Sequence, residues 1–337
     1  MHYLITGHTG FKGAWLSLLL QEQGHQVSGL ALAPEKKSIY EVAALGHLYK
    51  HDLRVDIRNH AELARAIEIV QPDVVIHLAA QALVRESYRI PRETFETNVM
   101  GTVNVLQAVS SGHPPLATLI ITTDKVYRNV NKLEGYVEED ALGGHDPYSS
   151  SKAAADLAAQ SWISTFPKFV AAIARAGNVV GAGDWSTDRL MPDLVNAGLQ
   201  GSPVVLRYPN AIRPWQHVLD CLSGYEAIVA ALLKGAGTGQ WNIGPKIETD
   251  KTVSLVAEKV TQKLGSTAGW VLDSSTQPHE AGYLLLDSTK IHQTLGWKEK
   301  LNFDETLEWT VEGYRRITQG NSTESVLRSQ IQAYLAK

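Results

Sequence analysis

The stretch "HYLITGHTGFKGAWLSLLLQ", residues 2–21, joins a short strand pattern to an apolar-rich helix pattern through three spaced glycines. Gly7, Gly10 and Gly13 give a G-x-x-G-x-x-G spacing, which differs from the general G-x-G-x-x-G dinucleotide pattern. Glycine lets the backbone turn tightly and approach a pyrophosphate, which then lies at the helix N-terminus. Because a strand precedes the glycines and a helix follows them, we interpret the stretch as a dinucleotide-binding loop rather than a plain turn.

Strand and helix patterns alternate from this loop through the first half of the chain. Further apolar or β-branched runs and helical stretches follow in turn: strands at 26–32, 73–80, 116–123 and 169–175, and helices at 59–70, 92–111 and 147–165. Continuous apolar strands separated by helices indicate a parallel sheet covered on both faces. The sequence therefore predicts an α/β fold with a Rossmann-type doubly wound parallel sheet.

The regular alternation of strand and helix patterns ends after Gly177, where glycine and proline become more frequent and polar loops become longer. A helix near 219–233 and a strand at 240–244 predict a return to the first sheet, and helices near 251–264 and 303–318 belong to a smaller lobe. We expect two interleaved parts: a dinucleotide-binding domain at 1–177 that the chain rejoins at about 215–244, and a smaller α/β substrate-binding lobe at 178–214 and 245–337.

The composition of the 337 residues is that of an ordinary globular protein, with 44% hydrophobic residues and a formal net charge of -4. Near-neutral charge without a basic stripe argues against nucleic acid as a partner. The longest apolar runs are too short to span a membrane. A single cysteine, Cys221, excludes an internal disulfide and fits a reducing cytoplasm. The dispersed histidines form no ligand pattern, so we expect no metal.

The end of the second strand lacks the acid that commonly holds the adenosine ribose of NAD. Ala31, Leu32 and Ala33 occupy the expected places, and Lys36 and Lys37 follow shortly after. The sequence therefore leaves the choice between NAD and NADP open. Farther along, Asp56 in "VDIRN" is placed to reach the adenine.

Tyr148 and Lys152 lie four residues apart on the helix predicted at 147–165, so both project from one face. A nearby ammonium favours phenolate over phenol and lowers the tyrosine pKa from about 10. Such a phenolate can take a proton from an alcohol while its hydride leaves for a nicotinamide. Tyr-x-x-x-Lys is common by chance, but after a glycine loop it predicts a catalytic pair.

Thr123, Asp124 and Lys125 follow one another where the strand at 116–123 ends. The carboxyl ends of parallel strands are where such folds bind ligands. A surface ion pair between Asp124 and Lys125 is the structural alternative, and the position at the sheet edge favours a functional role.

Several motifs together resemble the extended short-chain dehydrogenase/reductase superfamily: the glycine loop, "HLAAQ" (77–81), "TNVMGT" (97–102) and "YSSSK" (148–152). Within it, longer stretches closely resemble the CDP-glucose 4,6-dehydratase family: "GHTGFKGAWL", "LVRESY", "TTDKVY", "RAGNVVGAGDW", "IRPWQHVLD" and "PHEAGYLLLD". These stretches cover nearly the whole chain. The chain departs from the family in lacking the acid often found after the second strand, which bears on cofactor affinity.

The resemblance implies oxidation at sugar C4, loss of water across C5 and C6, and return of hydride to C6, with NAD as cofactor. Tyr148 would begin as base, with Lys152 tuning it and holding the nicotinamide ribose. Asp124 would be the acid for the departing 6-hydroxyl, which requires a pKa raised by burial. Thr123 would hydrogen-bond the C4 oxygen. Related dTDP-glucose dehydratases carry a glutamate, an obvious base, at the position of Lys125. Lys125 would be either the base for the C5 proton or a stabiliser of the enolate.

The resemblance also implies binding residues and partners. The cofactor-binding residues implied are Gly7, Thr9, Gly10, Phe11, Lys12, Gly13, Asp56, Ile57, Leu78, Ala79, Ala80, Gln81, Asn98, Thr122, Tyr148 and Lys152. The residues expected to bind a nucleotide sugar, CDP-glucose by resemblance, are Asn178, Arg189, Arg207, Arg213 and His279. Guanidinium groups suit phosphate oxygens, and Arg213 is the strongest of the three arginine candidates. Superfamily members pair the helices predicted at 92–111 and 147–165, so we expect a homodimer through a four-helix bundle.

Two other functions remain open. A nucleotide-sugar epimerase would use the same Tyr148 and NAD but needs no acid–base pair for elimination, so the triplet at 123–125 argues against it. A non-catalytic NAD(P)-sensing regulator could keep this fold without the tyrosine and lysine, both of which are present.

Overall fold

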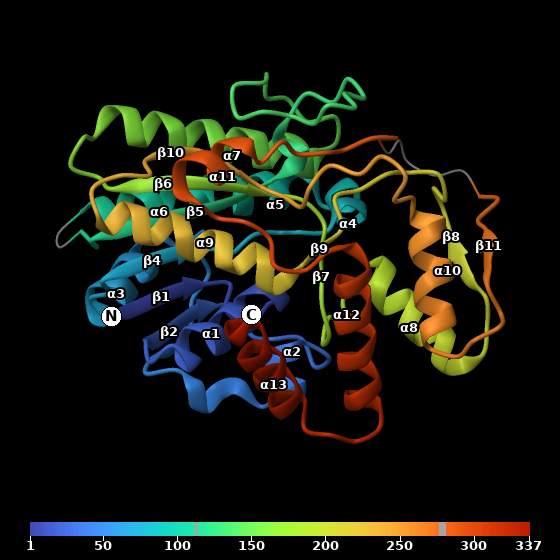
Figure 1. Ribbon diagram of the computed structural model, residues 1–337. Coiled ribbons are helices and arrows are strands. Elements are labelled where there is room, and N and C mark those ends of the chain that lie inside the picture. Colours follow the sequence, from blue (N-terminus) through green and yellow to red (C-terminus); the bar gives the residue numbers. More distant parts are fainter. Residues whose placement is uncertain (112–113, 276–280) are drawn as a thin grey trace.

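A computed structural model describes residues 1–111, 114–275 and 281–337 (Figure 1). Its centre is a seven-stranded sheet in the order β10-β6-β5-β4-β1-β2-β3, and all neighbouring strands are parallel. The strands are β1 (His2–Thr6), β2 (Gln26–Ala31), β3 (Asp52–Arg54), β4 (Val74–His77), β5 (Ala117–Thr123), β6 (Ala171–Ala176) and β10 (Gly239–Ile243). The expected doubly wound α/β fold is confirmed.

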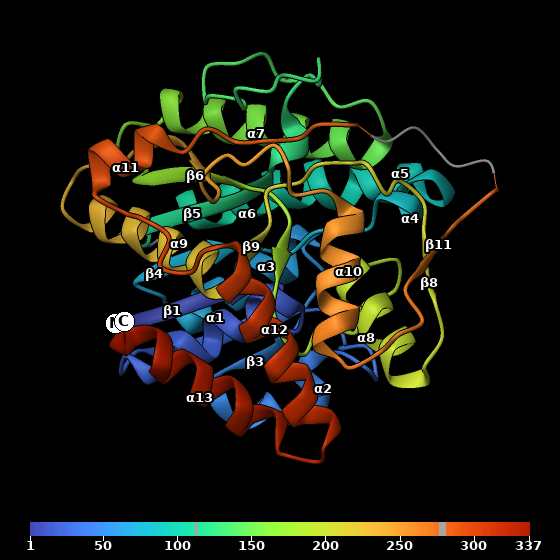
Figure 2. The same cartoon turned by 45° about the vertical axis from the view of Figure 1, so that its right-hand side comes forward.

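Helices cover both faces of this sheet, as the continuous burial of β1, β4, β5 and β6 requires (Figures 1 and 2). One face carries α1 (Phe11–Glu22) and α9 (Val218–Leu233), and the other carries α3 (His60–Val70), α6 (Gly101–Ser110) and α7 (Pro147–Thr165). Each layer encloses its own apolar core, so the strands are held from two sides.

The helix expected at 92–111 forms from three successive segments. Helix α5 (Pro91–Phe95) continues through a π-helical stretch, Glu96–Met100, into α6. One-turn π stretches inside helices frequently occur at functional sites. This one carries Asn98, whose side chain is fully buried.

The second part of the chain lies at the carboxyl edge of the sheet, on the right of Figure 1. It contains two short parallel strand pairs, β7 with β9 and β8 with β11, and several helices. Its elements are β7 (Val179–Val180), α8 (Leu190–Gln200), β8 (Val204–Leu206), β9 (Gln216–His217), α10 (Val253–Lys263), β11 (Trp270–Leu272) and α12 (Phe303–Thr318). Short helices elsewhere in the described chain include α2 (Ile39–Val42) and α4 (Val84–Arg89) in the first part and α11 (Thr289–Leu295) in the second.

The last helix, α13 (Thr323–Ala336), returns to the sheet and packs against α1. Its apolar residues Leu327, Ile331 and Tyr334 are buried in the same core as α1. Arg328 forms an ion pair with Glu22 at the end of α1. The chain end is thereby fixed to the first helix. Among the described helices, none has the length and apolar character needed to cross a membrane.

Candidate active site

The triplet at the end of β5 turns sharply into the carboxyl edge of the sheet. Thr123 is the last residue of β5, and its hydroxyl accepts a hydrogen bond from the Lys125 N–H at 3.3 Å, which starts a single 3-10 turn. This turn buries Asp124 while Lys125 reaches the adjoining cavity. The side chains of Thr123, Asp124 and Lys125 therefore take different directions from the same place at the carboxyl edge of the sheet.

Asp124 has the environment of a proton donor. Its side chain is 1% exposed, and Oδ1 accepts a hydrogen bond from the Thr123 hydroxyl at 2.9 Å. Oδ2 is buried without a hydrogen-bond partner among the described residues. Burial raises the pKa of this carboxyl, and the charges of Lys125 and Arg213 only partly oppose the shift. The expectation of a raised Asp124 pKa is thus confirmed.

Gly177, which follows β6, leaves the space that Asp124 occupies. A Cβ at this position would lie 2.8 Å from Asp124 Oδ2 and 2.5 Å from Pro214 Cγ. Both distances are too short for a Cβ atom, so a side chain here would displace the carboxyl or the proline. The sequence marked this glycine only as the point where the strand and helix pattern changes, not as part of the site, although it lies in the motif "RAGNVVGAGDW".

Tyr148 and Lys152 come from the first turns of α7. Asp146 caps this helix by accepting a hydrogen bond from the Ser149 N–H at 2.9 Å, and the Tyr148 N–H donates to Ser87 Oγ at 3.1 Å. The Lys152 ammonium donates to the Ile121 carbonyl on β5 at 2.8 Å. The cap and these two bonds fix the helix start against the sheet.

The pKa values of this pair correct one expectation. Burial raises the pKa of Tyr148, although the Arg189 charge and the Thr123 hydroxyl oppose it. We expected Lys152 to lower this pKa, but its ammonium points to the Ile121 carbonyl. Burial lowers the pKa of Lys152 itself to about 8, and the Lys12 charge contributes in the same direction. Thr123 and Arg189, rather than Lys152, are the groups that favour the phenolate.

The glycine loop makes close approaches that exclude side chains. Gly7 has φ +75°, and a Cβ there would lie 2.8 Å from the Ala79 nitrogen; a Cβ at Gly13 would lie 2.4 Å from the Gly7 carbonyl oxygen. Gly10 precedes α1 without any side-chain cap, so the first N–H groups of α1 face out of the helix. This open helix N-terminus in a glycine cradle fits the pyrophosphate of a dinucleotide.

Residues after β4 line the same edge. The Gln81 N–H donates to Asn98 Oδ1 at 2.8 Å, and Asn98 Nδ2 donates to Ser151 Oγ at 2.9 Å. The π-helical stretch thus joins the β4 loop to α7. Leu78, Ala79 and Ala80 are partly exposed in this loop.

The remaining expected cofactor residues are arranged less uniformly. Thr9, Phe11 and Lys12 are partly exposed in the glycine loop and the first turn of α1, and the Lys12 ammonium donates to the Tyr225 hydroxyl at 3.1 Å. Thr122 donates its hydroxyl to Asp156 at 2.9 Å, which directs this side chain into the protein rather than toward the edge.

The expected adenine-binding residues lie beyond β3. Asp56 forms an ion pair with Arg58, and its side chain is 28% exposed. Ile57 is buried beneath Gly101, where an added Cβ would lie 2.5 Å from Ile57 Cδ1. Because of its ion pair with Arg58, the Asp56 carboxylate is already partly engaged.

A cavity of about 270 Å³ opens beside the triplet, between the sheet edge and the second part of the chain. Lys125 lines it together with Asn178, Arg189, Arg207 and Arg213, so four of the five expected substrate residues meet at one place. The fifth, His279, lies outside the described residues. The cationic lining suits a diphosphate.

The expected substrate arginines differ in their contacts. Arg213 is 4% exposed, and its guanidinium donates to the Ile212 and Ala281 carbonyls, both at 2.8 Å. Arg207 forms an ion pair with Asp188 at 3.5 Å. Arg189 donates to the Ala82 carbonyl at 3.4 Å. Arg213 is thus the most firmly fixed of the three.

Further cavity residues escaped the sequence analysis. Arg85 and Tyr88 come from α4, His145 precedes α7, and Tyr208 follows β8. A signal existed for the first two, because "LVRESY" follows a strand end at the ligand-binding edge. Tyr208 lies in a loop without a recognisable pattern.

Comparison with known proteins defines the class to which this fold and site belong. A model of the GDP-mannose 4,6 dehydratase family matches residues 4–310. The chain belongs to this family, within the NAD-dependent epimerases and dehydratases of the extended short-chain dehydrogenase/reductase type.

Two relatives and one solved structure locate the chain within the family. It is 41% identical to the CDP-glucose 4,6-dehydratase of Salmonella typhimurium, over 98% of this chain and 95% of that protein. It is 29% identical to a probable dTDP-glucose 4,6-dehydratase of Sinorhizobium fredii, over 93% of both. The dTDP-glucose 4,6-dehydratase of Streptomyces venezuelae, solved with NAD and TYD bound, is similar with a TM-score of 0.82 and 26% identity over 94% of this chain and 97% of that chain.

Proposed function

We propose that this chain is a CDP-glucose 4,6-dehydratase that uses NAD to convert CDP-D-glucose to CDP-4-dehydro-6-deoxy-D-glucose. The observation that carries the proposal is the buried Asp124 carboxyl with an unpartnered Oδ2, next to Lys125 on the cavity wall. An epimerase that only oxidises and reduces C4 has no use for this second acid–base pair. The identity to the Salmonella relative supports CDP-glucose as substrate.

The oxidation step depends on Tyr148 and Thr123. The Tyr148 phenolate takes the proton of the C4 hydroxyl. The Thr123 hydroxyl turns from Asp124 Oδ1 to donate its hydrogen bond to the oxygen that becomes the carbonyl, which protonation of Asp124 permits. When bound, NAD supplies the acceptor and later donor of hydride, and its positive nicotinamide favours the phenolate. Lys152 is held by the Ile121 carbonyl beside this point, where it can bind the nicotinamide ribose.

The elimination step depends on Asp124 and Lys125. The C4 ketone acidifies the C5 proton; this proton leaves, the C6–O bond breaks, and Asp124 donates a proton to the departing hydroxyl to give water. The Lys125 ammonium makes no hydrogen bond or ion pair among the described residues, and it lines the cavity where C5 would lie. It either takes the C5 proton or stabilises the enolate.

The glycine cradle supports NAD binding by residues Gly7, Gly10 and Gly13, with the open N-terminus of α1 for the pyrophosphate. We propose that Asn178 and the cavity arginines hold the substrate diphosphate. We also keep the two-part division of the chain as a proposal: 1–177 and 215–244 for the cofactor, 178–214 and 245–337 for the nucleotide sugar.

We further propose a cytoplasmic homodimer. Apolar side chains are exposed on the neighbouring helices α5 to α7: Phe95 is 40%, Met100 53% and Leu157 54% exposed. Covering such residues is the usual reason for helix pairing between subunits. Sedimentation of the purified protein should give twice the chain mass, and Leu157→Glu should give one chain mass; monomeric wild-type protein would contradict the proposal.

The experiment that tests the function is incubation with CDP-glucose, and separately with dTDP-, UDP- and GDP-glucose, with NAD added. We expect loss of one water and a new C6 methyl signal by mass spectrometry and NMR, from CDP-glucose. Unchanged mass with inverted C4 would identify an epimerase. Dinucleotide binding without turnover of any of the four would favour a sensor.

The two roles of Lys125 are separated by solvent exchange. In deuterated water, the wild-type product should carry deuterium at C5. If Lys125 is the base, Lys125→Met should abolish both elimination and C5 exchange. If it stabilises the enolate, the variant should retain slow exchange at C5.

A further inference from the structure

Two neighbouring residues of the loop between β7 and α8, Asp188 and Arg189, contact the first part of the chain at the cavity. Asp188 Oδ1 accepts a hydrogen bond from Arg85 Nη1 of α4 at 3.1 Å. Arg189 donates to the carbonyl of Ala82, which precedes α4, at 3.4 Å. All four residues line the cavity. The loop therefore connects the two parts of the chain at the cavity wall.

The Asp188 carboxylate also contacts a second guanidinium group. Arg207 follows β8 in the second part of the chain, and its Nη1 lies 3.5 Å from the same Oδ1 atom of Asp188. One carboxylate oxygen is thus shared by two guanidinium groups, one from each part of the chain. Two guanidinium groups that converge on one oxygen atom are equally suited to a phosphate oxygen.

The contacts of Asp188 are of a kind that a stronger anion can replace. The side chains of Asp188 and Arg85 are each 45% exposed, and that of Arg207 is 28% exposed. Exposed ion pairs contribute little to stability, because water solvates both charges and salt screens their attraction. A diphosphate carries more negative charge than a carboxylate, and its oxygens match the planar fork of a guanidinium.

The other carboxylates among the described residues of the cavity wall are placed differently. Asp146 accepts hydrogen bonds from the N–H and the hydroxyl of Ser149, at 2.9 and 2.6 Å, so it is used by the cap of α7. Asp193 lies in the first turn of α8, and burial raises the pKa of its carboxyl. Asp188 is therefore the carboxylate that joins two arginines of this cavity.

The backbone at Asp188 allows its charge to be removed without a change of shape. Asp188 lies in a turn with φ +59°, which is the left-handed region. Aspartate and asparagine adopt this conformation more readily than most residues that carry a Cβ. Asparagine can therefore replace Asp188 with the same backbone and nearly the same side-chain volume.

We propose that Arg85 and Arg207 exchange the Asp188 carboxylate for the diphosphate of the nucleotide sugar. The proposal rests on the proposed function and adds Arg85 and Asp188 to the residues that act on the substrate. Asp188 opposes binding, because its contacts with both guanidinium groups must break before the diphosphate takes them. A diphosphate held by both arginines then joins the two parts of the chain.

The test is titration of the purified protein with CDP by calorimetry. Asp188→Asn removes the competing charge, and we expect it to lower the Kd of CDP about threefold to fivefold. Arg85→Gln removes a phosphate contact and should raise the Kd about tenfold. The sign of the first effect is decisive. If Asp188 only held the guanidinium groups in place for the diphosphate, Asp188→Asn would weaken CDP binding.

The double variant separates exchange from simple repulsion. In Arg85→Gln, one of the two contacts that Asp188 gives up is already absent. Adding Asp188→Asn to this variant should therefore tighten CDP binding by a smaller factor than it does in the wild-type protein. A carboxylate that only repels the diphosphate through space would give the same factor in both, and that outcome overturns the exchange.

A matched control removes the same charge elsewhere. Asp304 forms an exposed ion pair with Lys259 at 2.9 Å and is not among the described residues that line the cavity. Asp304→Asn should leave the Kd of CDP unchanged. An unchanged or higher Kd in Asp188→Asn overturns the proposal, whereas turnover of CDP-glucose by the same preparation of wild-type protein would leave the proposed function in place. Wild-type protein that binds no CDP would overturn both.

Discussion

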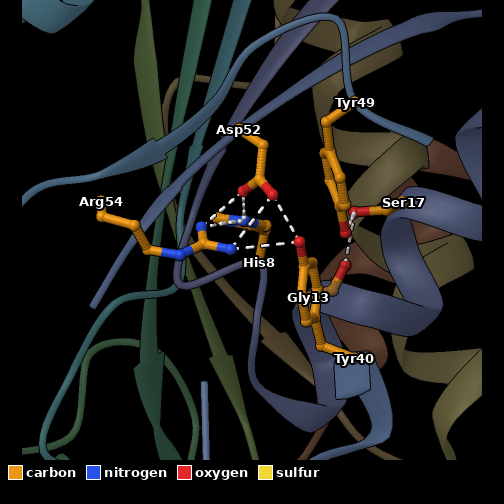
Figure 3. A network of polar contacts seen from close by, with 7 residues as sticks. All are labelled: His8, Gly13, Ser17, Tyr40, Tyr49, Asp52 and Arg54. Atoms are coloured by element: carbon orange, nitrogen blue, oxygen red, sulfur yellow. Dashed lines mark hydrogen bonds and ion pairs between the residues drawn. The ribbon is translucent and has the colours of Figure 1, made fainter. Parts of the chain in front are cut away.

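The proposed catalytic triplet at the end of β5 and the polar cluster around Arg54 at the end of β3 are built in different ways. At the first, Thr123, Asp124 and Lys125 are consecutive, and one turn separates their side chains into their positions. In the second, Asp52 and Arg54 of β3 contact His8 of the glycine loop and Tyr40 of α2, which come from separate elements (Figure 3). Chemistry encoded in consecutive residues is visible in a sequence, whereas chemistry assembled by strand register is not.

The largest expected effect is at Tyr148. Tyr148→Phe removes the base for the C4 hydroxyl, and we expect turnover of CDP-glucose to fall by roughly 10⁴-fold. The Kd of NAD⁺ should change little in comparison. Tyr88→Phe, which alters an exposed tyrosine of the cavity wall, is the matched control. Turnover that is retained in Tyr148→Phe would remove the role of base from Tyr148.

Asp124→Asn should separate elimination from oxidation. The amide cannot protonate the departing hydroxyl, so we expect product formation to fall by roughly 10²–10³-fold while C4 oxidation continues. Absorbance of the reduced nicotinamide should therefore accumulate in the variant. No accumulation, with oxidation and elimination lost together, would remove the acid role from Asp124.

The raised pKa of Asp124 also gives a pH dependence. The acid must be protonated, so wild-type turnover should decline as pH rises through this raised pKa. A profile of kcat in Asp124→Asn should lack that decline. If kcat of Asp124→Asn declines with rising pH as in the wild type, a group other than Asp124 causes the decline.

Lys152→Met should stabilise the protein while it abolishes activity. The folded-state pKa of about 8 lies below the ordinary 10.5, so the folded protein binds fewer protons than the unfolded chain between these values. Stability contributed by this group is therefore lowest below pH 8 and rises between about 8 and 10.5. The difference corresponds to up to about 3 kcal/mol at pH 7.

Urea unfolding of both proteins at pH 7 and pH 10 measures this effect. The wild-type protein should gain stability relative to Lys152→Met as the pH increases. A variant that is less stable than wild type at pH 7 would show that the bond from Lys152 to the Ile121 carbonyl outweighs the burial of its charge.

The smallest effect is expected at Gly177. In Gly177→Ala the new Cβ would meet Asp124 Oδ2 and Pro214 Cγ, so the carboxyl must shift by a fraction of an ångström. We expect kcat to fall roughly tenfold with KM nearly unchanged, and the thermal unfolding temperature to fall because overpacking typically costs about 1–3 kcal/mol. An unaffected kcat would show that the position of Asp124 has more freedom than the structure indicates.

The sequence predicted the elements with strong patterns and missed the weak ones. The helix expected at 147–165 spans Pro147–Thr165, because a proline and an Asp146 cap mark its start. By contrast, β3 has three residues, none of them buried, and gives no apolar pattern. Helix α8 lies in a region where glycines and prolines predicted loops, and α13 has a weakly patterned sequence whose buried face depends on α1.

The same limit applies to the site. Motifs located Thr123, Asp124, Tyr148 and Lys152, because each lies near an element end that the sequence predicts. The place of Gly177 in the site could not be recognised, since it depends on the Asp124 carboxyl that the neighbouring strand β5 brings close. The upward shift of the Tyr148 pKa depends on burial, which spacing alone does not reveal.

The central claim is that one site oxidises C4, eliminates water and returns the same hydride to C6. CDP-glucose deuterated at C4, incubated with the protein and NAD, tests it most directly. The account predicts loss of one water and a single deuterium in the new C6 methyl group. Deuterium that stays at C4 without loss of water would contradict the account and indicate an epimerase.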